Sequence, residues 1–280
     1  MNATDDDGAV SRRSVLLGGL AGGAGVVGGF ALGRWSAGAT PGTRETLTRA
    51  QRHAAQPDGL FRIPTTEPMV ALTFDDGPDP LYTPTVLDLL AATGSSATFF
   101  LVAVNAAAEP DLVRTILDAG HGVGNHTYDH RDLELLTTEQ VQVEIERAQA
   151  LLVASGCPPL DLFRPPKGYT DEVVGVLADA DTYRTVFWDA CVEHFVDHQD
   201  VAAGVAQLVA KVRPGSIVLA HDSGRIVGSG RAPLSRARTM EALPQVIRGL
   251  ADKGLRVVDV ATLLAATGTP VLSHQAEPTA

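Results

Sequence analysis

From residue 69 onward, short apolar segments alternate with longer stretches in which apolar residues recur at helical spacing. Short apolar segments are typical of buried strands, and the longer stretches are typical of helices that cover a sheet. The short segments predict strands at residues 70–74, 97–101, 121–124, 161–163, 184–188, 216–220 and 255–258. The longer ones predict helices at residues 84–92, 110–119, 137–154, 171–180, 201–212 and 238–253, and a short helix near Leu264.

Three of these helices have recognisable ends. Thr83 precedes Pro84 and is expected to cap the first helix, because threonine is a good N-cap and proline fits the first turn. Residues 137–140 have the threonine and glutamine spacing of a capping box. Gly120 is expected to close the second helix.

The alternation predicts seven β/α units. Such a pattern favours a parallel sheet with right-handed crossovers, and seven units would close into a barrel one unit short of the usual eight. A chain of 280 residues with 45% hydrophobic content can form one large core. We therefore expect an α/β fold, a distorted (β/α)7-type barrel at residues 69–267, with its active site at the carboxyl ends of the strands.

The N-terminus has the layout of an export signal. Arg12 and Arg13 stand immediately before an apolar run at residues 15–32 that contains seven glycines, and small residues at 37–39 form a cleavage site. Residues 1–39 thus resemble a twin-arginine signal peptide, which implies export to the cell surface or the extracellular space. Retention as an N-terminal membrane anchor is the alternative, since the run is about long enough to span a bilayer.

The remaining segments are expected to be tails. Residues 40–68 are polar and interrupted by four prolines, so they are interpreted as a linker or wrapping arm, and residues 268–280 as a polar tail. The net charge of −11 argues against a nucleic-acid partner, and we expect a monomer. Cys157 precedes the fourth predicted strand and Cys191 follows the fifth, at opposite ends of the barrel, so free thiols are expected.

Chemically distinctive side chains follow several of the predicted strands. The carboxyl ends of parallel strands meet at one rim, so these side chains are expected to converge there. They are Asp75 and Asp76 after the first strand, His126 and His130 after the third, Arg164 after the fourth and His221 after the sixth.

Two histidines and a carboxylate suit a catalytic metal site. His126 and His130 are four residues apart, a spacing that would place both rings on one side of a helical turn. One aspartate would complete a three-ligand site with open positions, and the other would be free to act as a base. Taken alone, the histidines are equally consistent with a surface pair, and the aspartates with a solvated turn at Gly77.

Residues 69–264 resemble the NodB-homology polysaccharide deacetylases, carbohydrate esterase family 4. The resemblance rests on TFDDG at residues 73–77, HTYDH at 126–130, RPP at 164–166 and LAH at 219–221. It implies one divalent metal, most simply Zn2+ with Co2+, Ni2+ or Mn2+ as alternatives. The roles it implies are metal ligands for Asp76, His126 and His130, catalytic base for Asp75, orientation of that base for Arg164, general acid for His221, and substrate or oxyanion contacts for Lys167, Trp188 and Leu219.

The chain departs from the family pattern at two places. Lys167 stands where the family usually has an aromatic residue, so one wall of the site is expected to be cationic. Alignment on Trp188 places His194 where an aspartate that tunes the general acid is expected. Asp189, Glu193 and Asp197 are the candidates to replace it, and His194 with His198 forms a second histidine pair at metal-ligand spacing.

The expected function is removal of acetyl groups from a glycan, with N-acetylglucosamine as the expected sugar. The resemblance implies metal-activated water, with Asp75 accepting a proton and His221 returning one to the leaving group. One alternative is a metal amidohydrolase of a small amide. The other is a glycan-binding protein that holds a metal but has weakened catalysis; the second aspartate at Asp75 argues against it.

Overall fold

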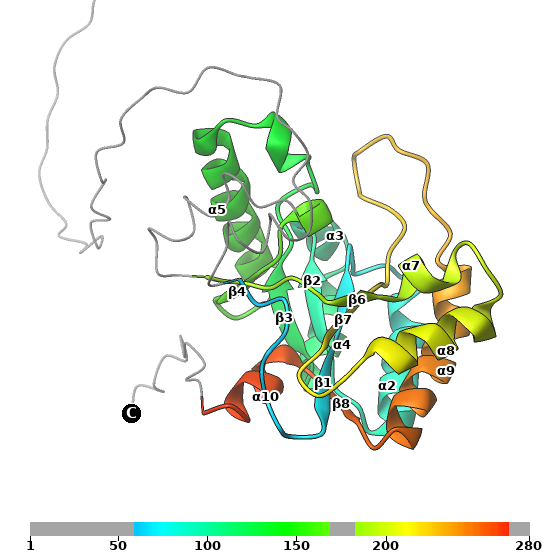
Figure 1. Cartoon of the computed structure of the whole chain (residues 1–280). Helices are drawn as coiled ribbons and strands as arrows, with labels where there is room; N and C mark the ends of the chain where they lie inside the picture. Colours follow the sequence, from blue (N-terminus) through cyan, green and yellow to red (C-terminus); the bar gives the residue numbers. More distant parts are fainter. Residues whose placement is uncertain (1–58, 169–182, 269–280) are drawn as a thin grey trace, which may run out of the picture. The chain divides into compact units, whose positions relative to one another are not determined.

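The computed structural model describes residues 59–168 and 183–268 (Figure 1). Its centre is one sheet of eight parallel strands in the order β5-β4-β3-β2-β1-β7-β6, with β8 also paired to β1. The strands are β1 (Met69–Asp75), β2 (Thr98–Leu101), β3 (Gly122–Asn125), β4 (Leu162–Phe163), β5 (Arg184–Thr185), β6 (Ala190–Cys191), β7 (Ile217–His221) and β8 (Arg256–Val258). The sheet is curled into a half-barrel, which confirms the predicted fold class.

Strand β1 occupies the middle of the sheet. All seven of its residues are buried, and it pairs with β7 along most of its length, so that Asp75 lies opposite His221. Its alternate residues pack on different sides: Leu72 and Phe74 contribute to one hydrophobic cluster, and Met69 and Ala71 to another. The carboxyl end of β1 therefore lies at the centre of the rim where the predicted site residues were expected.

The described helices connect and cover the strands. They are α2 (Thr83–Thr93), α3 (Ala103–Ala108), α4 (Pro110–Asp118), α5 (Thr138–Ala154), α7 (Val192–Val196), α8 (Val201–Lys211), α9 (Ala237–Asp252) and α10 (Val260–Ala265), with 3-10 turns at Leu133–Leu135 and Pro166–Gly168. Helices α7, α8 and α9 pack on one another beside β7 (Figure 1). No helix in the described ranges is long and apolar enough to cross a membrane.

Several local predictions can be compared with this structure. The capping box is confirmed, because both Thr137 and Gln140 bond to the other's backbone. The cap at Thr83 is wrong: Tyr82 is the N-cap residue, and the Thr83 hydroxyl instead donates to Asp222 at 2.6 Å. Strand β6 and the short helices α3 and α7 were not predicted, since their few residues give no measurable periodicity. Both cysteines are free thiols, as predicted.

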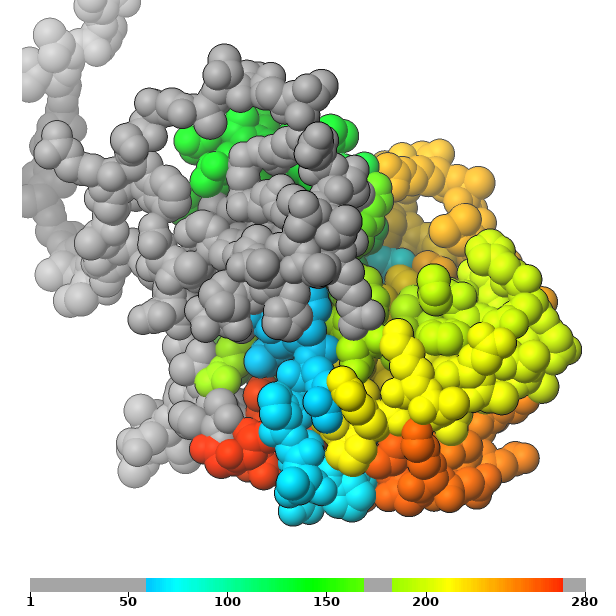
Figure 2. Space-filling model, in the orientation of Figure 1, coloured from blue at the N-terminus to red at the C-terminus, as the bar shows by residue number. Residues whose placement is uncertain are grey.

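Residues 60–63 lie across the open side of the half-barrel. Leu60 forms a parallel bridge with Val186, just after β5, and Arg62 forms an antiparallel bridge with Ser216, just before β7. Phe61 stacks on Phe187 with ring centroids 4.3 Å apart. In the space-filling view these blue residues lie beside the yellow residues that precede β7 (Figure 2). The predicted signal at residues 1–39, residues 40–58, the predicted helix at 171–180 and the tail at 269–280 lie outside the described residues.

Candidate active site

Asp75 and Asp76 reach the same rim because the backbone leaves strand geometry between them. Asp76 has a φ of 73°, a left-handed conformation that ordinary residues rarely adopt. The Asn105 amide donates to the Asp76 carbonyl at 2.7 Å and holds this turn. Gly77 follows, and a Cβ there would lie 2.5 Å from an Asp222 carboxylate oxygen, so a larger residue would not fit. The two aspartates can therefore face one site.

His126 and His130 meet through a loop and not through the predicted helical turn. Residues 126–130 are not helical, and both Thr127 and His130 have left-handed φ angles of 70° and 57°. The Asn125 side chain accepts from the Thr127 N–H at 2.9 Å, and the Thr127 hydroxyl accepts from the His130 N–H at 3.2 Å. These side-chain bonds stabilise a loop that brings the ring centroids to 5.1 Å.

Asp76, His126 and His130 form a cluster that could hold a metal ion. One donor atom from each lies within 4.8 Å of the others, with Asp76 Oδ1 3.6 Å from His126 Nε2 and 3.3 Å from His130 Nε2. Asp76 Oδ1 is buried and makes no hydrogen bond within the described part of the chain. A buried carboxylate oxygen without a hydrogen-bond partner is costly unless a cation is bound, so these residues fit a divalent metal.

The tautomer of His126 suits a metal ligand. Its Nδ1 lies 2.7 Å from the Arg164 carbonyl, to which it donates, so Nε2 keeps a free electron pair on the side of Asp76. Burial lowers the pKa of His126 to about 3, and the nearby His130 adds to that effect. The ring is therefore neutral at pH 7, the form that binds metals. His194 and His198 belong to no such cluster among the residues described.

Arg164 is fully buried and fixes Asp75. Its Nη1 donates to Asp75 Oδ1 at 2.7 Å and to the Thr73 hydroxyl at 2.8 Å. Its Nε and Nη2 donate to the carbonyls of Val186 and Phe187, each at 3.0 Å. The guanidinium is thus held on several sides and engages one oxygen of Asp75. The other oxygen, Oδ2, lies 3.7 Å from His126 Nε2, next to the metal-ligand cluster.

Glu193 is the carboxylate that pairs with His221. Glu193 Oε1 lies 3.2 Å from His221 Nδ1, accepts from the His221 backbone N–H at 3.0 Å, and accepts from the Thr239 hydroxyl at 2.9 Å. Burial alone would lower the pKa of His221, but the charge of Glu193 outweighs it and raises that pKa to about 9. Burial likewise raises the pKa of Glu193, and the charge of His221 more than reverses this, to about 2. The pair is therefore ionised at neutral pH.

The other candidates for that role lie elsewhere. Asp189 accepts from the Ser216 hydroxyl at 2.9 Å and from the Ile217 N–H at 3.0 Å, and so supports the start of β7. Within the described ranges, neither His194 nor Asp197 makes a hydrogen bond or ion pair with His221. The alignment placed His194 at the tuning position, but the preceding residue supplies the carboxylate.

Lys167, Trp188 and Leu219 lie around this cluster. Lys167 has a left-handed φ of 59°, and its ammonium pairs with Asp132, so the expected cationic wall carries a compensating negative charge. Trp188 is half-buried, with the Arg164 guanidinium 5.5 Å from its ring centroid. Leu219 is buried within β7 and is 2% exposed, two residues before His221.

Arg236 was missed by the sequence analysis. It is the residue before α9, its side chain is 12% exposed, and its Nη2 donates to Asp76 Oδ2 at 3.1 Å. It matches no motif and lies 160 residues from Asp76 in the sequence. A lone arginine in a polar loop gives no signal that it is buried, so only the fold reveals it.

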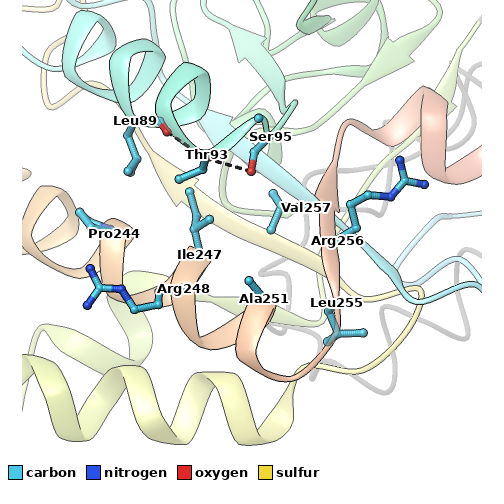
Figure 3. A pocket seen from close by; sticks show the side chains of 11 residues that line it. Leu89, Thr93, Ser95, Pro244, Ile247, Arg248, Ala251, Leu255, Arg256 and Val257 are labelled. Carbon is cyan, nitrogen blue, oxygen red and sulfur yellow. Dashed lines mark hydrogen bonds between the residues drawn. The ribbon is translucent and has the colours of Figure 1, made fainter.

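A second pocket lies away from this rim, between α2, α9 and β8 (Figure 3). It has a volume of about 430 Å3 and is lined mainly by apolar side chains, including Leu89, Ile247 and Val257. Its charged residues are Arg248 and Arg256, and no carboxylate or histidine lines it. Acid–base chemistry is therefore confined to the carboxyl-end site, as far as these two places are concerned.

Comparison with known proteins agrees with this geometry. The model of the family described as polysaccharide deacetylase matches residues 62–186. A peptidoglycan-N-acetylglucosamine deacetylase of Bacillus cereus is 35% identical over 223 residues, which cover 76% of this chain and 97% of the relative.

Two solved structures are similar as well. A family 4 carbohydrate esterase from Streptomyces lividans in complex with acetate aligns with a TM-score of 0.58 and 34% identity, over 69% of this chain and 93% of that one. A family 4 pseudoenzyme from Bacillus anthracis aligns with a TM-score of 0.63 and 26% identity, over 74% and 68% of the two chains. The chain belongs to the NodB-homology polysaccharide deacetylases, carbohydrate esterase family 4.

Proposed function

We propose that this protein is an exported, metal-dependent deacetylase that hydrolyses the N-acetyl group of a glycan containing N-acetylglucosamine. The observation that carries the proposal is the arrangement around Asp76. Its buried Oδ1 lies beside two histidine nitrogens, and the Asp75–Arg164 and His221–Glu193 pairs belong to the same rim. That arrangement provides a cation site, a base and an acid.

The first step needs a base next to the metal ligands. A divalent ion held by Asp76, His126 and His130 would act as a Lewis acid towards the acetyl carbonyl and the attacking water. Asp75 accepts the proton of that water through Oδ2, because Oδ1 is occupied by Arg164. Arg164 keeps the carboxylate ionised and correctly oriented, as a buried positive charge favours the anionic form.

The second step needs a proton donor for the leaving amine. His221 is protonated below a pKa of about 9, so it carries a proton over the whole neutral range. Its Nδ1 faces Glu193, which leaves Nε2 as the nitrogen that donates to the sugar amine, or to the alcohol if the substrate is an O-acetyl ester.

A backbone N–H completes the site. Pro165 and Pro166 have no N–H, so the first amide after Arg164 that can donate to the developing oxyanion belongs to Lys167. The side chain of Lys167 is not needed for that bond, and the replacement of an aromatic residue there leaves the donor in place. Removing a comparable donor in other enzymes costs about 3 to 4 kcal/mol.

The substrate and the location follow from separate observations. The Bacillus cereus relative is a peptidoglycan-N-acetylglucosamine deacetylase, and its sugar is therefore our first choice. The net charge of −11 disfavours a strongly acidic polymer and favours a neutral glycan. The twin-arginine pattern at residues 12–13 would direct the protein, already folded, to the surface or the exterior.

A glycan-binding role without turnover is the second candidate, because one structural neighbour is a pseudoenzyme. It predicts sugar binding without release of acetate. A small-amide hydrolase is the third candidate, and it predicts activity on N-acetylated monosaccharides alone.

The test is acetate release from chitin oligomers, with and without a chelator. The proposed function predicts release that stops with chelator and returns with Zn2+. Asp75→Asn should keep about one metal ion per chain and lose most turnover, because a base is removed and a ligand is not. Asp76→Ala should lose the metal. Release that persists in Asp75→Asn, or in the chelated protein, would contradict the proposed roles.

A further inference from the structure

Arg236 and Asp76 form an ion pair between two distant parts of the site. Arg236 Nη2 donates to Asp76 Oδ2 at 3.1 Å, and both side chains are largely buried, at 12% and 13% exposed. The pair engages only Oδ2. Asp76 Oδ1, the oxygen nearest to both histidine rings, is the one that makes no hydrogen bond in the described ranges.

The arginine itself is held in place. Its Nε donates to the Ser223 carbonyl at 2.7 Å, and its backbone N–H donates to the Tyr82 hydroxyl at 3.1 Å. Ser223 follows the end of β7 by two residues, so the guanidinium is fixed by the same strand that carries His221. A guanidinium with these contacts cannot rotate away from Asp76 without losing a buried hydrogen bond.

We propose that Arg236 is a positioning residue that restricts Asp76 to binding the metal through Oδ1 alone. The proposal rests on the metal role assigned to Asp76 above. A carboxylate with both oxygens free can bind a metal through one or both of them, and the number of bound oxygens changes the coordination geometry. By holding Oδ2, Arg236 presents one oxygen to the cation and keeps the other coordination positions for water and substrate.

Two bland alternatives predict different results. If the pair only anchors the start of α9 to the sheet, its loss lowers stability and leaves metal affinity unchanged. If Arg236 acts only through its charge, its removal takes a cation away from a cation site, and metal should bind more tightly. A positioning role alone predicts weaker binding, because the ligand loses its orientation.

The experiment compares Arg236→Met with Arg236→Lys, and uses Arg238→Met as a matched control. Arg238 belongs to α9 and donates to the carbonyls of Val196 and Gln199, so its loss also removes contacts of α9 without touching Asp76. Zn2+ affinity is measured by competition with a chromophoric chelator, and coordination geometry by the absorption spectrum of the Co2+ form. Folding of each variant is checked by circular dichroism.

We expect Arg236→Met to bind Zn2+ about 10- to 100-fold more weakly than the unmodified protein, as for other residues that orient metal ligands. Its Co2+ spectrum should change in shape and intensity. Arg236→Lys should recover part of the affinity, since lysine supplies one donor, and Arg238→Met should behave as the unmodified protein does.

Unchanged or tighter Zn2+ binding by folded Arg236→Met would overturn the proposal. So would an equal loss in Arg238→Met, because that result would mean a general effect on α9. These outcomes are distinct from a failure of the proposed function: there, the unmodified protein itself binds no metal ion that Asp76→Ala abolishes, and both proposals fall.

Discussion

Asp75 and Asp76 are adjacent and chemically identical, yet their surroundings give them different capacities. Each has one oxygen engaged by a buried arginine, Arg164 for Asp75 and Arg236 for Asp76. The remaining oxygen of Asp76 is nearest to the two histidines, and that of Asp75 lies 3.7 Å from His126 Nε2. The division into ligand and base thus follows from which arginine binds which oxygen.

The His221–Glu193 pair determines the expected pH dependence. The folded pKa of His221 is raised to about 9, so the acid form is present below that pH and is lost as the pH rises through it. In Glu193→Gln the carboxylate is absent and burial lowers the pKa below its usual value of about 6.5. The alkaline limb of kcat/KM should move down to near pH 6.5, and the rate at pH 7.5 should fall about tenfold.

The matched control for this experiment is His194→Asp. Because Glu193 already contacts His221, a new carboxylate at the position that the family alignment indicates should leave the alkaline limb where it is. Rate against pH, with metal saturating, distinguishes the two variants. A limb that moves only in His194→Asp would show that the alignment identified the tuning position and the observed pair did not.

At this scale the sequence was informative where residue type and strand end coincide. Asp76, His126 and His130 were expected at one rim because each follows a parallel strand, and their donor atoms do lie together. The partner of His221 could not be chosen among four neighbours, since the choice depends on which side chain of a five-residue helix faces β7. Arg236 had no motif at all.

At the scale of elements, regular periodicity was read correctly and short irregular segments were not. The 17-residue helix α5 has a complete capping box, and the sequence shows both partners. The histidine spacing, by contrast, suggested a helical turn, whereas Asn125 and Thr127 stabilise a loop with left-handed residues. Side-chain bonds to the backbone override spacing in so short a segment.

Helix α7 carries Glu193, and its position depends on a close approach of α8. A Cβ on Gly204 would lie 2.2 Å from the Phe195 carbonyl oxygen, which is a backbone atom that cannot rotate away. Helix propensity alone predicts that Gly204→Ala stabilises the protein by about 1 kcal/mol. We expect the overlap to dominate and the free energy of unfolding to fall by about 1 to 3 kcal/mol.

Gly249→Ala is the control, because the nearest atom to its new Cβ is a methyl carbon of Val209 at 2.9 Å, which a small side-chain movement can accommodate. Urea unfolding of both variants gives the comparison. If Gly204→Ala is as stable as Gly249→Ala or more so, α7 and α8 are farther apart than described.

On the scale of the whole molecule, the alternation of strands and helices was sufficient for the fold class, but not for how the barrel is completed. The end strands of the sheet, β5 and β6, have only two residues each. The open side is bridged by Leu60 and Arg62, which belong to a segment interpreted from its prolines as a linker or wrapping arm. Single bridges have no periodicity, so no pattern in the sequence marks them.

If this segment completes the core, a single truncation within it should destabilise the domain. Phe61 is 8% exposed and stacks on the buried Phe187, so Phe61→Ala should lower the free energy of unfolding by about 3 kcal/mol. Leu135→Ala is the control, since Leu135 is 81% exposed and its loss should cost less than about 0.5 kcal/mol. Equal stability of the two variants in urea unfolding would mean that residues 60–63 only rest on the barrel. A large loss in Phe61→Ala alone would move the start of the folded domain ahead of Met69, to the residues that span its open side.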